Sequence, residues 1–261
     1  DFNGVELDFM RFPTFFSRQV SYEARAKFMR EFILGVRELL DRRGEERPIC
    51  VRVPQRWDIS LEVGLDLETW TQEGLVDLVN ISPFYETSDE MDIELYREKL
   101  PKAKLFGEIH YCSTCIQDIE LGLECTRKMT PEMLRTTAET FLSRGADGIS
   151  LFNFVYYRDF SFGNPVKLDK FEPPFAALKD ITNKEKLAEE PKHYLSAQQT
   201  RFYQGQFPLD LTNPGSRRLQ ALINISADFS SPDVRKPFVE MAILRLQFQD
   251  KVNDAEVTVR R

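Results

Sequence analysis

The sequence predicts an α/β fold in which part of a (β/α)8 TIM barrel is followed by part of a C-terminal β-sandwich. Three observations lead to this prediction. Five short apolar segments alternate with helical patterns between residues 1 and 182, which is typical of βαβ units in a parallel sheet. Polar residues follow each of these segments. Beyond residue 216 apolar residues recur with a period of two, as in antiparallel strands with one solvated face.

The opening strand carries two carboxylates on one face. Val5, Leu7 and Phe9 alternate with Glu6 and Asp8. In a barrel of parallel strands the apolar face packs under helices, and the carboxylates would point inward near the C-terminal mouth, where such barrels carry their active sites. The alternative is a solvated edge strand with an ordinary polar face.

A long helix is expected after this strand. Ser21 is a good N-cap, and Gly44 ends the helix. Its apolar stripe has helical spacing and consists of Ala24, Phe28, Phe32, Val36, Leu39 and Leu40. The stripe predicts the face on which this helix covers the sheet.

Four more strands are expected, each followed by a helical pattern. The strands are predicted at 49–54, 76–82, 103–110 and 147–154. Helices are expected near 66–73, from Ser88 or Asp89 onward, from the N-cap Thr130 to Gly145, and from Phe175 through Ile181. A doubly wound open sheet is the competing architecture, but the sequence has no glycine-rich phosphate loop of either common type.

These patterns divide the chain into three parts. Residues 1–182 are expected to form the barrel segment, 183–216 a polar linker with several prolines, and 217–261 a partial β-sandwich.

The composition restricts the possible partners. There are 35 Lys and Arg against 42 Asp and Glu, giving a net charge of −7 without a basic block, which argues against a nucleic-acid protein. No apolar run approaches the roughly 20 residues of a membrane span. Neutral or cationic substrates fit better, and an extracytoplasmic location is favoured although the sequence leaves the compartment open.

Two motifs resemble a known group of proteins. The run E-L-D-F-M-R-F-P at 6–13 resembles the fourth-strand signature of bacterial glycoside hydrolase barrels known mostly from genomes. The run V-D-L-V-N-I-S-P-F-Y at 76–85 is similar to the sixth strand of the same group. The resemblance implies that the five predicted strands are strands 4 to 8 of the barrel. It also implies that the first three units, the N-terminal part of the barrel, lie upstream of Asp1.

The chemistry expected from this resemblance is glycoside hydrolysis by two carboxylates. Asp8 and Glu108 are the predicted pair, because the ends of the fourth and seventh strands can face each other across a barrel mouth, as in large groups of retaining glycosidases. Those groups usually carry Glu on the fourth strand, so Asp8 departs from their pattern. Arg52 would pair with Asp8 and keep it ionised, leaving Glu108 as the acid. The reverse assignment remains open.

Further residues are expected to bind an oligosaccharide or polysaccharide. The predicted substrate-binding residues are Glu6, Arg11, Arg52, Trp57, Asn80, Tyr85, His110, Asn153 and Tyr156. Trp57 and Tyr85 would serve as stacking platforms for sugar rings, whereas Trp70 is expected in the core. For Glu6 the alternative is a structural carboxylate bonded to Arg11 or Arg52.

Cysteines suggest a second chemistry that we rank lower. His110 precedes Cys112 and Cys115, and Cys125 follows, but a zinc site needs four ligands and no second paired motif is present. We therefore expect no metal and no cofactor. The main alternative to a glycosidase is a non-catalytic carbohydrate-binding or structural barrel module of a surface protein.

Overall fold

A computed structural model of the chain describes residues 3–10, 13–42, 44, 47–83, 86–118, 123–157 and 172–194. Residues 114–127 are described by their backbone alone where they belong to these ranges. The predicted β-sandwich at 217–261 lies outside the described residues, as do Arg11 and Tyr85.

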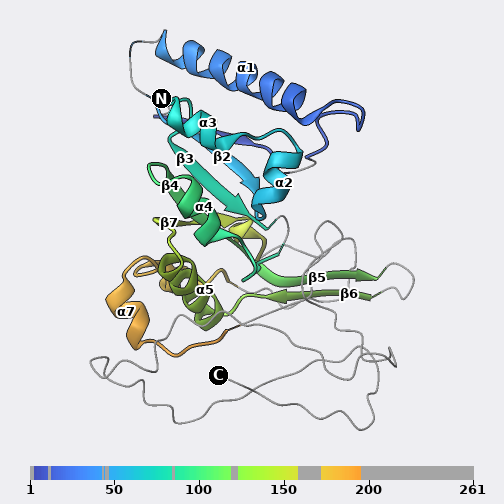
Figure 1. The fold of residues 1–261 in the computed structure, drawn as a ribbon. Helices are drawn as coiled ribbons and strands as arrows, with labels where there is room; N and C mark the ends of the chain where they lie inside the picture. The colour runs from blue at the N-terminus through green and yellow to red at the C-terminus, as the bar shows by residue number, and fades with distance from the viewer. Residues whose placement is uncertain are drawn as a thin grey trace. The chain divides into compact units, whose positions relative to one another are not determined.

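A parallel sheet of five strands forms the centre of the described chain (Figure 1). Its strands are β1 (Val5–Asp8), β2 (Ile49–Pro54), β3 (Leu78–Ser82), β4 (Lys104–His110) and β7 (Gly148–Phe152). Their order in space, β1-β2-β3-β4-β7, follows the chain, so each strand is added at the same edge. The predicted parallel α/β arrangement is confirmed, and the sequential order is compatible with part of a barrel.

Helices connect the strands and follow the last of them, and the predicted N-caps Ser21 and Thr130 are confirmed. They are α1 (Tyr22–Asp41), α2 (Trp57–Glu62), α3 (Leu67–Gln72), α4 (Ile93–Lys99), α5 (Pro131–Ser143), the 3₁₀ turn η1 (Phe154–Tyr157), α6 (Phe175–Leu178) and α7 (Lys184–Glu189). Ser21 accepts a hydrogen bond from the Ala24 amide, and Thr130 accepts one from the Met133 amide. No helix in the described ranges is both long and apolar enough to cross a membrane.

Two helices differ from their predicted extents. α4 begins at Ile93 rather than near Ser88, because the amides of Thr87 and Asp92 are bonded to the carbonyls of Cys112 and Gln55 and hold the preceding segment non-helical. α6 ends at Leu178, short of the predicted Ile181. α7 falls inside the predicted linker, where it is capped by Asn183 and buries Leu187.

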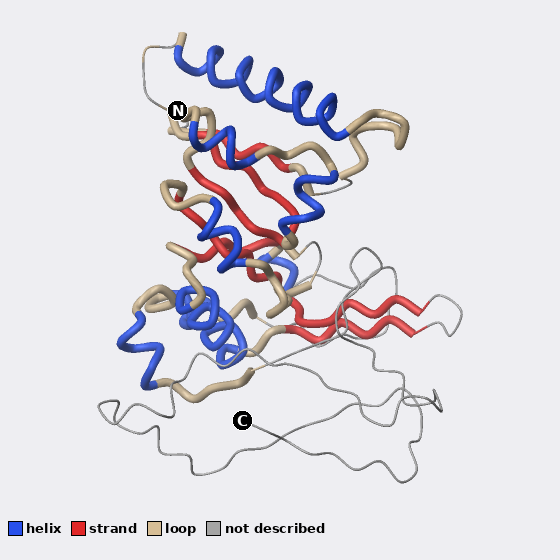
Figure 2. Tube along the Cα trace, in the orientation of Figure 1, coloured by secondary structure: helices blue, strands red, loops and turns tan. Residues whose placement is uncertain are grey.

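A β-hairpin that the sequence analysis missed follows β4. It consists of β5 (Cys112–Asp118) and β6 (Leu123–Lys128), which pair antiparallel and extend away from the sheet (Figure 2). The segment that looked like a cysteine-bearing loop is therefore a two-stranded ribbon. Its sequence is predominantly polar, so no apolar alternation marked it as two strands.

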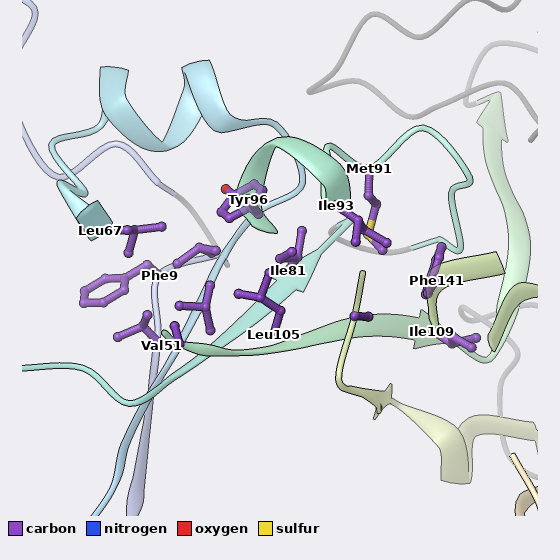
Figure 3. Packing of buried hydrophobic residues seen from close by; sticks show 14 of the residues in the cluster. Phe9, Val51, Leu67, Ile81, Met91, Ile93, Tyr96, Leu105, Ile109 and Phe141 are labelled. Carbon is purple, nitrogen blue, oxygen red and sulfur yellow. The ribbon is translucent and has the colours of Figure 1, made fainter. Parts of the chain in front are cut away.

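The hydrophobic core lies between the sheet and its helices (Figure 3). Fully buried side chains of the expected outward parity come from three neighbouring strands and include Val51, Ile81, Leu105 and Ile109. Helices α3, α4 and α5 cover them with Leu67, Tyr96 and Phe141. Trp70 is fully buried, as predicted.

Helix α1 is rotated relative to the prediction, so that only part of the predicted stripe faces the core. Phe28, Phe32 and Leu39 are 55%, 51% and 56% exposed, whereas Met29 and Ile33 are buried. The predicted stripe is therefore wrong at these three exposed residues, whereas Val36 and Leu40 pack against the core.

Two arginines fix this rotation of α1. Arg37 donates to the carbonyls of Arg47 and Leu75 and to the carboxylate of Asp77, while Arg30 forms a bidentate pair with Glu73. These bonds lie on the same side of the helix as Ile33, because residues 30, 33 and 37 share one face. Hydrophobic spacing alone gave no sign of these polar contacts.

Two strand glycines allow close approaches within the fold. A Cβ on Gly107 in β4 would lie 2.5 Å from the Phe141 ring of α5, and one on Gly148 in β7 would lie 2.6 Å from the Phe106 ring. Such distances are shorter than van der Waals contact, so glycine is needed at both positions. The first approach lets α5 pack directly on the sheet.

We predict opposite effects for two alanine substitutions. Gly107→Ala should destabilise the chain by about 1–3 kcal/mol, because Phe141 must move. Gly35→Ala is the matched control, since a Cβ at this exposed helical site meets nothing within 4 Å, and it should stabilise by about 0.5–1 kcal/mol. Urea unfolding checks both. An unchanged midpoint for Gly107→Ala would show that the close packing is not needed.

Candidate functional site

Polar side chains collect near the carboxyl ends of β1 to β4. In the sheet register Asp8 stands opposite Arg52, and Arg52 stands opposite Asn80. Glu108 lies further along β4, opposite Ser150 of β7. The predicted face is confirmed, because these residues share the side of the sheet opposite to the apolar core.

One guanidinium binds both predicted catalytic carboxylates. Arg52 Nε lies 2.6 Å from Glu108 Oε2, and Nη2 lies 2.8 Å from Oε1. Arg52 Nη1 lies 3.0 and 3.1 Å from the two Asp8 oxygens. The expected pairing of Arg52 with Asp8 is confirmed, and the bidentate contact with Glu108 is stronger in geometry.

The two carboxylates differ sharply in exposure. The Glu108 side chain is only 1% exposed, whereas that of Asp8 is 44% exposed. Asp8 Oδ1 also accepts a hydrogen bond from the Met10 amide at 2.8 Å. Asp8 therefore lies at the rim of the site and Glu108 on its floor.

Two residues that the sequence analysis missed complete the surroundings of Arg52. Ser82 is fully buried and donates to Glu108 Oε1 at 2.6 Å while accepting from Arg52 Nη2 at 2.8 Å. The Phe152 ring lies 4.0 Å from the guanidinium carbon, a cation–π contact. Ser82 lies two residues after Asn80 on β3 and therefore faces the same side of the sheet. This spacing could have identified Ser82 from the sequence.

Burial and hydrogen bonding act on the pKa of Glu108 in opposite directions, and burial is the larger effect, so this pKa is raised. Burial raises the pKa of the Glu108 carboxyl, and the charge on Glu6 adds to the rise. The hydrogen bonds and charge of Arg52, together with the Ser82 hydroxyl, work to lower this pKa. The carboxyl thus depends on its donors to remain ionised.

Asn80 links the deeper carboxylate to the same group. Its Nδ2 lies 3.3 Å from Glu6 Oε2, 3.4 Å from Glu108 Oε2 and 3.1 Å from Ser150 Oγ. Glu6 also accepts from the Cys50 thiol at 3.2 Å. Glu6 is therefore held by Asn80 and Cys50 rather than by Arg52, and the other expected partner, Arg11, lies outside the described residues.

His110 lies at the end of β4 among aromatic rings. Its Nδ1 is 3.2 Å from Cys112 Sγ, and its Nε2 is 3.4 Å from Asn153 Nδ2. Asn153 has φ of 53°, the left-handed region that asparagine tolerates better than most residues. Burial, followed by the positive charge of Arg52, lowers the pKa of His110 to about 3, so the ring is neutral at physiological pH.

The predicted aromatic platforms have different positions. Trp57 begins α2, a helix that the sequence did not predict, and its indole is 7% exposed and packs edge-on against the Tyr96 ring, with the ring centroids 5.0 Å apart. Its ring faces are therefore largely covered. Tyr156 is 37% exposed and contacts the Tyr111 ring at 5.9 Å, so it offers more free surface.

A cavity of about 360 Å³ opens beside Trp57. It is lined by Gln55, Arg56, Trp57, Asp58, Glu90, Asp92 and Leu95. Because Gln55 directly follows β2, the cavity lies at the carboxyl end of the sheet. Arg56 is paired with Asp58, so two further carboxylates leave the lining acidic.

The described residues hold no group of three or more His, Cys, Asp and Glu side chains placed to bind a metal ion. The fold and the site together define an α/β protein with a polar cluster at the carboxyl end of a parallel sheet. No protein-family model matches the sequence, and neither does any curated protein.

The neutral state of His110 predicts a loss of stability in acid. Its folded pKa lies below the unfolded value of about 6.5, so the unfolded chain takes up the proton first. The contribution of His110 is fully present above about pH 6.5 and is lost as the pH falls toward 3, by up to about 1.4 kcal/mol per pH unit.

Unfolding measured between pH 7 and 4 checks this prediction. His110→Gln should flatten the decline, because glutamine does not titrate. The control is His193→Gln, which removes the only other histidine of the chain and should keep the steep decline. Equal slopes for the wild type and His110→Gln would contradict the prediction.

Proposed function

We propose that the chain is part of a glycoside hydrolase in which Asp8 and Glu108 cleave a glycosidic bond. The observation that carries the proposal is the binding of both carboxylates to Arg52 near the carboxyl ends of sequentially ordered parallel strands. Carboxyl ends of strands are where (β/α)8 barrels carry their active sites. We further propose that β1, β2, β3, β4 and β7 are strands 4 to 8 of such a barrel.

The donors around the two carboxylates suggest different roles. Arg52, Ser82 and Asn80 all donate to Glu108, a set suited to an ionised carboxylate. We therefore assign Glu108 as the group that meets the developing positive charge on the sugar. Asp8 is 44% exposed and lies at the rim of the site, where a leaving oxygen can reach it, so we assign it as the acid that protonates the leaving oxygen.

The remaining polar groups support binding of a sugar. His110 and Asn153 supply ring and amide nitrogens next to the floor of the site, and Tyr156 offers an exposed ring. The cavity beside Trp57 lies at the same end of the sheet and can take a further part of an oligosaccharide or polysaccharide. We expect retention of anomeric configuration, which requires the reacting carboxyl groups to lie about 5 to 5.5 Å apart, against about 6.5 to 9.5 Å for inversion.

Neutralising either carboxylate tests the proposal. Release of nitrophenol from a panel of 4-nitrophenyl glycosides, and of reducing ends from polysaccharides, by the intact protein that carries this chain first identifies a substrate. Asp8→Asn and Glu108→Gln should then each lower kcat at least 100-fold, while Asp41→Asn, at an exposed site on α1, should leave it unchanged.

Folding must be measured alongside turnover. Glu108→Gln removes the buried charge that faces Arg52, and we expect a loss of roughly 3–5 kcal/mol in stability. Activity is therefore expressed per folded protein, from circular dichroism of the same samples. Near-normal turnover by folded Glu108→Gln would show that Glu108 is structural and that the two-carboxylate mechanism is wrong.

The burial of Glu108 favours a second candidate, a non-catalytic module that binds glycan. In this candidate Glu108, which is 1% exposed and bonded on both oxygens, serves to hold Arg52 and does not meet the substrate. This candidate predicts binding of an oligosaccharide by calorimetry without cleavage, and binding that survives in Asp8→Asn.

A further inference from the structure

Ser82 occupies the end of β3, between the guanidinium and the carboxylate of the site. Its Oγ is 2.6 Å from Glu108 Oε1 and 2.8 Å from Arg52 Nη2, and these two atoms are themselves 2.8 Å apart. The three atoms form a closed triangle of hydrogen bonds. Ser82 is fully buried, so its hydroxyl is held within this triangle.

The chemistry of the three groups fixes the direction of the hydroxyl. A guanidinium can only donate hydrogen bonds, so Arg52 Nη2 donates one to Ser82 Oγ. The single hydroxyl hydrogen of Ser82 then points at Glu108 Oε1. Glu108 Oε1 thus accepts two hydrogen bonds, and this arrangement disfavours protonation of that oxygen.

We propose that Ser82 is a positioning residue for Glu108, holding Oε1 beside Arg52 and keeping the carboxyl group in its ionised form. The consequence for catalysis rests on the proposed function, but the hydrogen bond and its effect on Glu108 do not. Burial raises the pKa of the Glu108 carboxyl, and the Ser82 hydroxyl is one of the groups that oppose this rise. Removal of the Ser82 hydroxyl should therefore raise the pKa of Glu108 further, because one of the groups that oppose the effect of burial is lost.

Ser60 provides a matched control within the same chain. It is 1% exposed, and its Oγ lies 2.7 Å from Tyr96 Oη. Tyr96 Oη donates in turn to the Pro54 carbonyl at 2.6 Å, so Ser60 also acts as a donor. Its acceptor is a neutral phenol rather than a carboxylate, so Ser60→Ala loses a comparable buried hydroxyl without touching Glu108.

The test is a titration of the Glu108 carboxyl by carbon NMR. The 261-residue chain is labelled at the glutamate side-chain carboxyl carbon, and the Glu108 signal is identified by its absence in Glu108→Gln. In Ser82→Ala we expect the titration to move up by about one pH unit, because a hydrogen bond to a charged group is lost. In Ser60→Ala it should remain at the wild-type position.

An unchanged Glu108 titration in folded Ser82→Ala would overturn the proposal, as would an equal rise in Ser60→Ala. If Ser82→Ala does not fold, Ser82→Cys replaces it, because a thiol has nearly the same shape but is a weaker donor. The proposal then requires a smaller upward shift, and no shift in Ser82→Cys overturns it.

Turnover gives an independent arm. On a substrate found in the glycoside panel, the limb of the kcat/KM profile that follows ionisation of Glu108 should move to higher pH in Ser82→Ala by the same amount as the NMR titration. Failure of the intact protein that carries this chain to cleave any of the glycosides argues against the proposed function, while the NMR titration still decides the role of Ser82.

Discussion

The guanidinium of Arg52 is the group on which the described sheet depends most. From its place in β2 it contacts Asp8 of β1, Ser82 of β3, Glu108 of β4 and the Phe152 ring of β7. The Arg52 side chain therefore contacts each of the four remaining strands of the sheet. A charge that is 3% exposed is costly to bury unless it is paired and hydrogen-bonded, so these contacts must form together.

The strands and the polar face were predictable because both follow from a two-residue period. Parity placed Asp8, Arg52 and Glu108 on the side of the sheet opposite to the apolar residues, and the structure agrees. Parity does not predict which of the polar side chains on this face lie close enough to bond to one another. The partners of Glu6 are Asn80 and Cys50, from the two neighbouring strands, and the choice among several nearby polar groups depends on side-chain conformation.

Two parts of the fold were missed for different physical reasons. The hairpin Cys112–Lys128 is stabilised by backbone pairing, which leaves little trace in a polar sequence. The rotation of α1 goes with the bonds of Arg30 and Arg37 to residues far along the chain, which the apolar spacing of the helix does not reveal. In both cases contacts between distant residues decided what local patterns could not.

The face of α1 that carries Phe28, Phe32 and Leu39 has a practical consequence. Each of these side chains is more than half exposed, and the stacked rings of Phe16 and Phe28 extend the surface into the preceding loop. Shielding apolar surface from water releases about 25 cal/mol per Å². Any contact between molecules that covers this face gains by mass action as the sample is concentrated. Where such a contact forms, the apparent size and stability of the chain depend on protein concentration as well as on the fold.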